Sequence, residues 1–288
     1  MFIGIIAALL SAASWAVGTI LFDKIGKTIP AAGMTFLKGL FSILFMSLLL
    51  CIYGLQHLCT EELLLLAASG LIGIALGDTF FFKSLQYLGA KMQVIYFMLG
   101  QVLTAFLSYL FLGEILSLVI YVGGLLVLIG VIMVIVGKQE NHTNKIRGII
   151  GGIMAMLCYS ISPIILKGVI TDISAVTATF YRMLFGTIFV LFGGAFSKSV
   201  KNWFAPLKDM RVLRLFLLNV MIVTYGGFLL SIVAIKYVDV ALASVLATTE
   251  PIFVLLLSYI LYKEKATWRE ILGTIITLSG VLIIIFHG

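Results

Sequence analysis

Four ionisable side chains stand inside long apolar runs of the sequence, where a charge is costly and usually has a function. Glu250 directly precedes Pro251, and a proline frees a backbone carbonyl and kinks its helix. A carboxylate beside such a loosened turn could bind a substrate amine or a proton. Lys38 and Arg182 could recognise an anionic group, and Asp78 could balance a cation.

Each of these residues also has a simpler structural interpretation. Glu250 could pair with Arg182 or Lys38 and hold two parts of the chain together. Lys38 and Arg182 could instead form a structural or gating pair, or extend their long side chains to an interface. Asp78 closely precedes Lys83 and could be a boundary residue paired with it. The residue types alone leave the functional and structural roles open.

Polar aromatic and amide side chains form a second candidate group. Trp15, Tyr96, Gln101, Tyr159 and Tyr225 fall in the middle of apolar segments. A tryptophan N–H or tyrosine O–H at such a position needs a hydrogen-bond partner, which favours a place beside a polar cavity. Tight helix packing is the alternative. We predict that these residues, together with Glu250, line a substrate cavity.

The motifs of several other protein classes do not occur. The sequence has no zinc-like cysteine and histidine spacing, no HExxH and no visible nucleophile–base pair. Gly26-Lys27-Thr28 imitates the end of a phosphate-binding loop, but Leu21 stands where its first glycine belongs. We therefore expect no enzyme activity, no metal, no cofactor and no use of ATP.

Composition places the chain in a lipid bilayer. It has 288 residues, 62% hydrophobic and 11% charged, whereas soluble domains are about 45–50% apolar and about 25% charged. The net charge of +7 comes from lysines and arginines in short connections between apolar runs. That distribution is typical of membrane topology and not of a nucleic-acid partner. We expect an integral, multi-pass membrane protein, in the plasma membrane if the source is bacterial.

The apolar runs predict an all-α fold of ten transmembrane helices. A span needs about 20 mostly apolar residues. The predicted spans are 2–22, 31–53, 62–83, 91–112, 117–136, 148–168, 174–195, 212–235, 240–261 and 267–286. The first of these lacks a positively charged start and a good cleavage site, so we interpret it as a span and not as a signal peptide.

The chain also repeats itself. One offset aligns the first helices of the two halves, and a slightly larger offset aligns the last ones. The aligned pairs are Trp15 with Tyr159, Lys38 with Arg182, Tyr87 with Tyr237, Glu114 with Glu264, Gly123 with Gly273, and Gly130 with Gly280. We predict a first five-helix repeat at 1–137, a connecting loop at 138–147 and a second repeat at 148–288. Five spans are an odd number, so the second repeat must be inverted, as in many secondary transporters.

These features resemble the EamA-like branch of the drug/metabolite transporter superfamily over the whole chain. The residues that carry the resemblance are Trp15, Lys38, Gly77-Asp78, Arg182, Glu250-Pro251, Glu264, Gly273 and Gly280. The resemblance implies a ten-helix transporter of metabolites, often an exporter. The family pattern has a proline in the middle of helices 4 and 9. Here Gln101 replaces the first of them, so a proline hinge in helix 4 does not carry over.

The expected function is secondary transport of a small metabolite, either amino acid-like or another small polar or amphipathic solute. We expect an exporter or exchanger that works by alternating access, with a proton as the candidate coupling ion and the bilayer as its surroundings. The alternatives are an intramembrane enzyme, a lipid-handling protein or a channel. The histidines lie at ends and in loops, which disfavours the enzyme. A channel would need a ring of like groups from several subunits.

Two arguments about orientation disagree. All lysines and arginines except Lys38, Lys167, Arg182 and Lys236 lie in the odd-numbered connections. The positive-inside rule then predicts that these connections are cytoplasmic and that both termini are outside. The family resemblance favours both termini inside. An even number of spans places the two termini on one side in either case.

Overall fold

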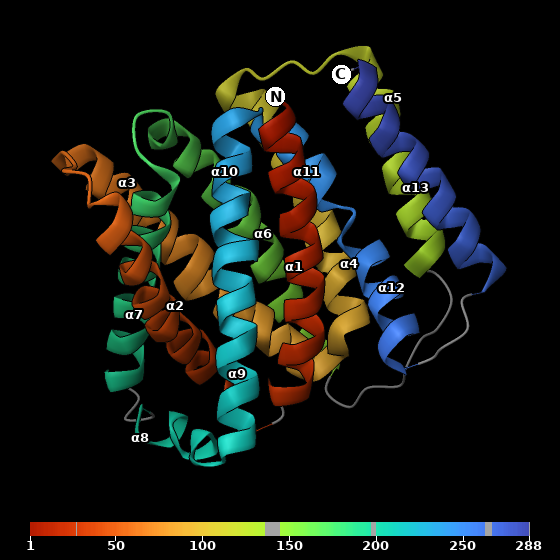
Figure 1. Ribbon diagram of the computed structural model, residues 1–288. Coiled ribbons are helices and arrows are strands. Elements are labelled where there is room, and N and C mark those ends of the chain that lie inside the picture. Colours follow the sequence, from red (N-terminus) through yellow and green to blue (C-terminus); the bar gives the residue numbers. More distant parts are fainter. Residues whose placement is uncertain (27, 136–144, 197–199, 263–266, 288) are drawn as a thin grey trace.

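Figure 1 shows the protein as a computed structural model. The structure describes residues 1–26, 28–135, 145–196, 200–262 and 267–287. Within these ranges every regular element is a helix (Figure 1). Seven helices are long and apolar enough to cross a membrane, and shorter apolar helices lie at Leu118–Met133, Val240–Val254 and Ile271–Ile284. Together they make the ten predicted passes, and the predicted all-α membrane fold is confirmed.

The first repeat crosses the membrane five times. The first two passes are α1 (Phe2–Gly26) and α2 (Ala31–Tyr53). The third pass is the continuous run of α3 (Thr60–Gly70), η1 (Leu71–Asp78) and the start of α4 (Thr79–Leu112). The rest of α4 is the fourth pass, and α5 (Leu118–Ile135) is the fifth. The chain reverses inside α4 at Gly89, whose φ of 74° and ψ of 173° are not helical. Glycine takes a positive φ at little cost, because it has no Cβ.

The second repeat follows the same plan. Its passes are α6 (Lys145–Ile170), α7 (Ala175–Phe196), the run of α9 (Met210–Ile222), η3 (Val223–Leu229) and α10 (Leu230–Tyr237), the broken pair α11 (Val240–Ala247) and α12 (Glu250–Tyr262), and α13 (Trp268–His287). The connection after α7 carries two short elements, α8 (Val200–Trp203) and η2 (Ala205–Lys208). Trp203 is buried against Gly33 and Gly194, between the ends of α2 and α7.

The two repeats are inverted and interlocked. Gly4 of α1 lies close against Val238 after α10, and Gly148 of α6 lies close against Leu88 in α4. These two contacts occupy equivalent positions in the two halves, so each repeat packs its first helix against the other repeat. Both termini lie at the same end of the bundle (Figure 1), as ten passes require. The inverted five-plus-five arrangement predicted from the sequence is therefore confirmed.

Glycines join α5 to α13 at the side of the bundle. A Cβ at Gly123 would lie 2.9 Å from the carbonyl oxygen of Gly280, and one at Gly130 would lie 2.5 Å from that of Gly273. Small residues allow two helix backbones to approach this closely. The repeated glycine spacing in the last helix of each half therefore makes one antiparallel helix pair, visible at the right of Figure 1.

Irregular turns occur inside three passes. The segments η1 and η3 are π-helix and lie at equivalent positions of the third and eighth passes. Such wide turns are rare and often mark functional sites. The ninth pass breaks between α11 and α12, where Pro251 cannot donate a backbone hydrogen bond. There Thr249 N donates to Leu246 O at 3.1 Å, and Ile252 N donates to Thr249 O at 3.0 Å.

The two ends of the bundle differ in charge. The end that holds the termini, here called the acidic face, carries Glu61, Glu62, Asp172 and Asp239. Its two lysines are occupied as helix caps. Lys167 Nζ donates to Ile235 O at 2.8 Å and to Val238 O at 3.0 Å, and Lys236 Nζ donates to Ile173 O at 2.6 Å.

The opposite end, here called the basic face, carries exposed cations on α8, η2 and α9. They are Lys201, Lys208, Arg211 and Arg214. Short connections rich in lysine and arginine usually lie on the cytoplasmic side of a membrane protein. The charge distribution therefore continues to favour a cytoplasmic basic face and external termini.

Two single-cysteine variants test this orientation. Native Cys59 is exposed on the acidic face, and Phe204 is exposed on the basic face. In a Cys51→Ala, Cys158→Ala background, Cys59 should react with a membrane-impermeant maleimide added to intact cells. With Cys59→Ser and Phe204→Cys in the same background, labelling should require permeabilised cells. The reverse pattern would place both termini inside.

Candidate functional site

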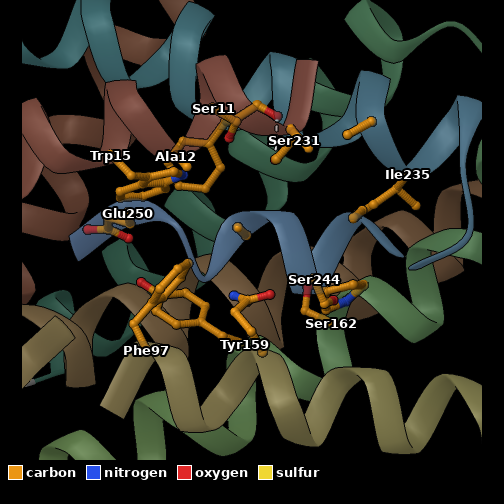
Figure 2. Close-up of a pocket in the computed structure, with 18 of the residues that line it drawn as sticks. Ser11, Ala12, Trp15, Phe97, Tyr159, Ser162, Ser231, Ile235, Ser244 and Glu250 are labelled. Atoms are coloured by element: carbon orange, nitrogen blue, oxygen red, sulfur yellow. Dashed lines mark hydrogen bonds between the residues drawn. The ribbon is translucent and has the colours of Figure 1, made fainter. Parts of the chain in front are cut away.

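A cavity of about 120 Å³ lies between the two repeats. Its walls come from α1, α4 and η1 of the first repeat and from α6, α7, η3, α10, α11 and α12 of the second. We call it the central cavity. Figure 2 shows its polar and aromatic side chains converging from several helices. An enclosed space between inverted repeats is where secondary transporters bind their substrates.

A carboxylate stands at one end of the central cavity. Glu250 begins α12 directly after the break in the ninth pass and is 3% exposed. Its Oε1 accepts a hydrogen bond of 3.1 Å from Thr19 Oγ1 of α1. Within the described residues no lysine or arginine forms an ion pair with it. The break in the helix therefore presents an acidic group to the cavity without a cation bound to it.

A guanidinium stands at the other end. Figure 2 places Ser162 and Ser244 far from Glu250 across the cavity. Arg182 Nη2 donates to Ser162 Oγ at 2.9 Å, so the Arg182 side chain lies at that end. Arg182 Nε is buried, and among the described residues it has no hydrogen-bond acceptor. A buried donor without a partner is costly, so this group is available to an anion entering the cavity.

Aromatic rings form another part of the cavity wall, and Figure 2 shows Trp15 and Phe97 on the same side of the cavity as Glu250. The ring of Trp15 is 4.8 Å from that of Phe228 and 6.3 Å from that of Phe81, both edge to face. Tyr159 lies 6.2 Å from both Phe81 and Phe97. Such rings bury large apolar areas and constrain one another in preferred geometries. These rings therefore give the cavity an apolar surface that suits an apolar group.

Lys38 and Asp78 form an ion pair beside the cavity. Lys38 Nζ binds Asp78 Oδ2, and both side chains are 1% exposed. Tyr159 Oη donates to Asp78 Oδ1 at 2.6 Å. Lys38 Nζ also lies 4.0 Å from the centre of the Phe228 ring, within cation–π range. The charge of Lys38 is therefore balanced by a carboxylate in direct contact, whereas the described residues show no such contact for its repeat equivalent Arg182.

Buried apolar layers lie on both sides of the cavity. Toward the basic face, the ring of Phe22 lies 5.0 Å from that of Phe82 and 6.2 Å from that of Phe216. We call these three residues the aromatic layer. Their repeat equivalents toward the acidic face are Leu166, Ile232 and Leu66, here called the aliphatic layer, which are also buried. The inverted repeat thus places one layer on each side.

The site residues predicted from the sequence lie in several different places in the structure. Trp15, Gln101, Tyr159, Arg182 and Glu250 all line the central cavity. The pair Lys38 and Asp78 packs next to it, and Pro251 is buried at the helix break.

Tyr96 and Tyr225 lie outside the lining. The Tyr96 ring covers Gly152, and Tyr225 Oη donates to Phe45 O at 2.6 Å. Both side chains are therefore placed by contacts between helices outside the cavity lining.

Several lining residues are not among those predicted. Phe81, in the run of three phenylalanines at 80–82, lines the cavity. Phe97, Phe228, Ser231 and Ser244 also line it. Serines in otherwise aliphatic spans are a signal that could have identified two of them. The phenylalanines carry no such signal, because most phenylalanines in membrane helices face lipid or core. Within the described residues there is no cluster of three or more metal-ligating side chains.

Comparison with known proteins gives one family. The profile of the EamA-like transporter family matches residues 2–136 and 146–286, once in each repeat. A solved structure described as a crystal structure of a protein aligns with a TM-score of 0.72 at 16% identity, covering 98% of this chain and 95% of that one. At that identity the likeness concerns the fold alone.

Three individual relatives match less than half of this chain each. An uncharacterized transporter of Archaeoglobus fulgidus is 25% identical over 140 residues, 49% of each chain. The uncharacterized inner membrane transporter YhbE of Escherichia coli strain K12 is 26% identical over 47% of this chain and 41% of its own length. The uncharacterized transporter YdfC of Bacillus subtilis is 36% identical over 37% of this chain and 33% of its own. This chain therefore spans half or less of these curated relatives.

The buried ion pair can be tested by removing one charge at a time. Asp78→Asn should destabilise the protein by about 3–5 kcal/mol, because Lys38 is then buried without an anionic partner. Adding Lys38→Met should restore much of the loss, because the orphan charge is gone. Thermal unfolding in detergent micelles measures both effects. The matched control is Asp172→Asn on the acidic face, where the side chain is exposed and the melting temperature should not change. Equal melting temperatures for Asp78→Asn and the control would contradict the pair.

Proposed function

The chain belongs to the EamA-like transporter family, and on that premise we propose that it is a secondary transporter of a small dipolar metabolite. The solute carries an anionic group at one end, a cationic group at the other and an apolar body between them, as amino acid-like molecules do. The protein works by alternating access as an exporter or exchanger. It is a multi-pass membrane protein, in keeping with its apolar helices.

The observation that carries this proposal is the separation of two buried charged groups across one cavity that is also lined by aromatic rings. Arg182 offers an unsatisfied guanidinium N–H at one end, and Glu250 offers a carboxylate at the other. A carboxylate of the solute would satisfy Arg182, and an ammonium would bind Glu250. Charge-assisted hydrogen bonds of this kind are about twice as strong as neutral ones. The aromatic rings of the cavity wall would hold the apolar body.

Alternating access follows from the inverted repeat. Inverted repeats can exchange conformations, which opens the binding site first to one side and then to the other. In this chain the aromatic layer would separate when access is from the basic face, and the aliphatic layer when access is from the acidic face. The interlocked packing implies that α1 moves with the eighth and ninth passes, and α6 with the third and fourth. The moving bodies are then not the two sequence halves.

A proton is the proposed coupling ion. Glu250 has Thr19 as its hydrogen-bond donor and no cation bound to it among the described residues. A buried carboxylate without a counter-charge is costly, so the empty cavity would hold a proton on Glu250. An arriving ammonium would replace that proton. Solute and proton would then occupy Glu250 in turn, which is the condition for exchange between them.

Matched probes test the dipolar recognition. The probe ε-aminocaproate carries both charges, caproate only the anion and n-hexylamine only the cation. We expect ε-aminocaproate to raise the melting temperature of the purified protein more than either of the others. Arg182→Gln should weaken binding of both carboxylates about tenfold to hundredfold. It should leave the n-hexylamine response intact, which also shows that the variant is folded. A response of the variant to caproate equal to that of the unmodified protein would exclude Arg182 as the anion site.

The coupling role of Glu250 needs a transport measurement. In vesicles with an imposed pH gradient, radiolabelled ε-aminocaproate should accumulate with the unmodified protein and not with Glu250→Gln. Exchange between equal pools at saturating probe should persist in the variant, because the glutamine oxygen can still accept a weaker hydrogen bond from the ammonium while the proton site is gone. Thr19→Ala retains the carboxylate and is the matched control, which should still accumulate the probe. Gradient-driven accumulation by Glu250→Gln would rule out proton coupling at this residue.

A further inference from the structure

A second hollow lies at the side of the bundle. It has a volume of about 470 Å³ and is enclosed by α4, α5 and α11, where the α5–α13 pair stands apart from the body of the protein. Most of its lining is aliphatic or aromatic. Val102, Phe106 and Leu125 are 43%, 57% and 59% exposed along it. We call this hollow the lateral crevice.

Two of the polar side chains at the lateral crevice, Glu114 and Thr248, already have partners. The two carboxylate oxygens of Glu114 accept hydrogen bonds of 3.0 Å from Val240 N and Ala241 N, and so cap the start of α11. Thr248 Oγ1 donates to Val245 O at 2.6 Å. Water gains few hydrogen bonds in such a space, and apolar cavities stay dry. At membrane depth the material at hand to fill it is hydrocarbon.

The dimensions fit one lipid chain. Along α4 the crevice runs from Gln101 to Tyr109, about 12 Å at about 1.5 Å per residue. One leaflet contributes about half of the roughly 30 Å hydrocarbon core. Taking a methylene to be similar in size to a water molecule, about 30 Å³, 470 Å³ holds on the order of fifteen such groups. The end near Glu114 lies toward the acidic face, and the end at Gln101 lies near mid-depth.

The inner end of the lateral crevice meets the central cavity. Gln101 lines both spaces. The break in the ninth pass lies beside it, with Thr248 on the crevice and Ala247 and Glu250 on the cavity. Only this glutamine and the broken helix separate a polar binding site from a crevice that opens toward lipid.

We propose that the lateral crevice binds one acyl chain of a phospholipid from the leaflet at the acidic face. The chain enters beside Tyr109 and Tyr121, and its terminal methyl group lies against Gln101. In this position the lipid completes the wall of the central cavity. The site would fix the membrane depth of the bound chain and the direction in which it points. Lipids that contact the outer surface of the bundle are not fixed in this way.

Photoreactive lipids test the site and its direction. The full chain is reconstituted in vesicles of dioleoylphosphatidylglycerol and dioleoylphosphatidylethanolamine, with a trace of phosphatidylglycerol carrying a diazirine on one acyl chain. A diazirine at the chain terminus should label Gln101 and Thr248, and one near the ester should label Tyr109 and Tyr121. The opposite pattern would mean entry from the other leaflet and would overturn the proposal.

Dilution into detergent separates a bound lipid from surrounding ones. Leu10 and Leu48 are exposed residues of the half of the bundle toward the acidic face, 51% and 63% exposed, and serve as comparison positions. On transfer to detergent micelles before irradiation, their labelling should disappear while labelling in the crevice persists. Equal loss at all positions would show that no chain is held there.

A substitution that fills the lateral crevice is the last control for lipid binding there. Ala105 lines the crevice, and Ala105→Trp should lower its labelling about tenfold. Leu191→Trp, at an exposed position of α7, should leave it unchanged. Crevice labelling that survives Ala105→Trp in a folded protein would contradict the site. These measurements use no transported solute, so their failure would leave the proposed function standing, and failure of the solute experiments would leave this site standing.

Discussion

The ion pair between Lys38 and Asp78 joins two helices of the first repeat and is contacted by the second, at a depth where neither charge could remain alone. Lys38 comes from the second pass and Asp78 from the wide turn of the third. Tyr159 of the sixth pass and Phe228 of the eighth contact the pair from the other repeat. Removing charge from water is costly, and only a close partner with further hydrogen bonds offsets it. Because these two charges neutralise each other, Arg182 and Glu250 remain to face the cavity.

The two repeats share one backbone arrangement, and the charged groups of the cavity occur where the two repeat sequences differ. Lys38 and Arg182 occupy equivalent positions, yet one is bound to a carboxylate and the other to the hydroxyl of Ser162. The residue equivalent to Asp78 is Phe228, so the second repeat has no carboxylate with which Arg182 could pair. Glu250 in turn is equivalent to Gly100 of the first repeat. A symmetric backbone thereby carries a cation at one end of its cavity and an acid at the other, which a symmetric sequence could not.

The fold was largely predictable from the sequence, because apolar run length and the aligned glycines, tyrosines and cations determine spans and repeat. The cavity was predictable only in part. Trp15, Gln101 and Glu250 were identified because a polar group inside a span needs a partner. The hydrogen-bond and ion-pair partners of these residues could not be predicted, because pairing depends on how each helix is rotated about its axis. The wide turns of η1 and η3 change that rotation within a span. Tyr96 shows the same difficulty, because a ring at mid-depth can equally cover a glycine such as Gly152.

The wide turns themselves have a mechanical consequence. A π-turn is one residue out of step with the α-helix, so its migration along a span would rotate the residues it passes by about 100° without a hinge. Asp78 is the last residue of η1. Moving that turn would swing its carboxylate away from Lys38 and away from the hydroxyl of Tyr159. The ion pair would then oppose a shift of helix register, and the strength of a single electrostatic contact would set how readily the third pass can twist.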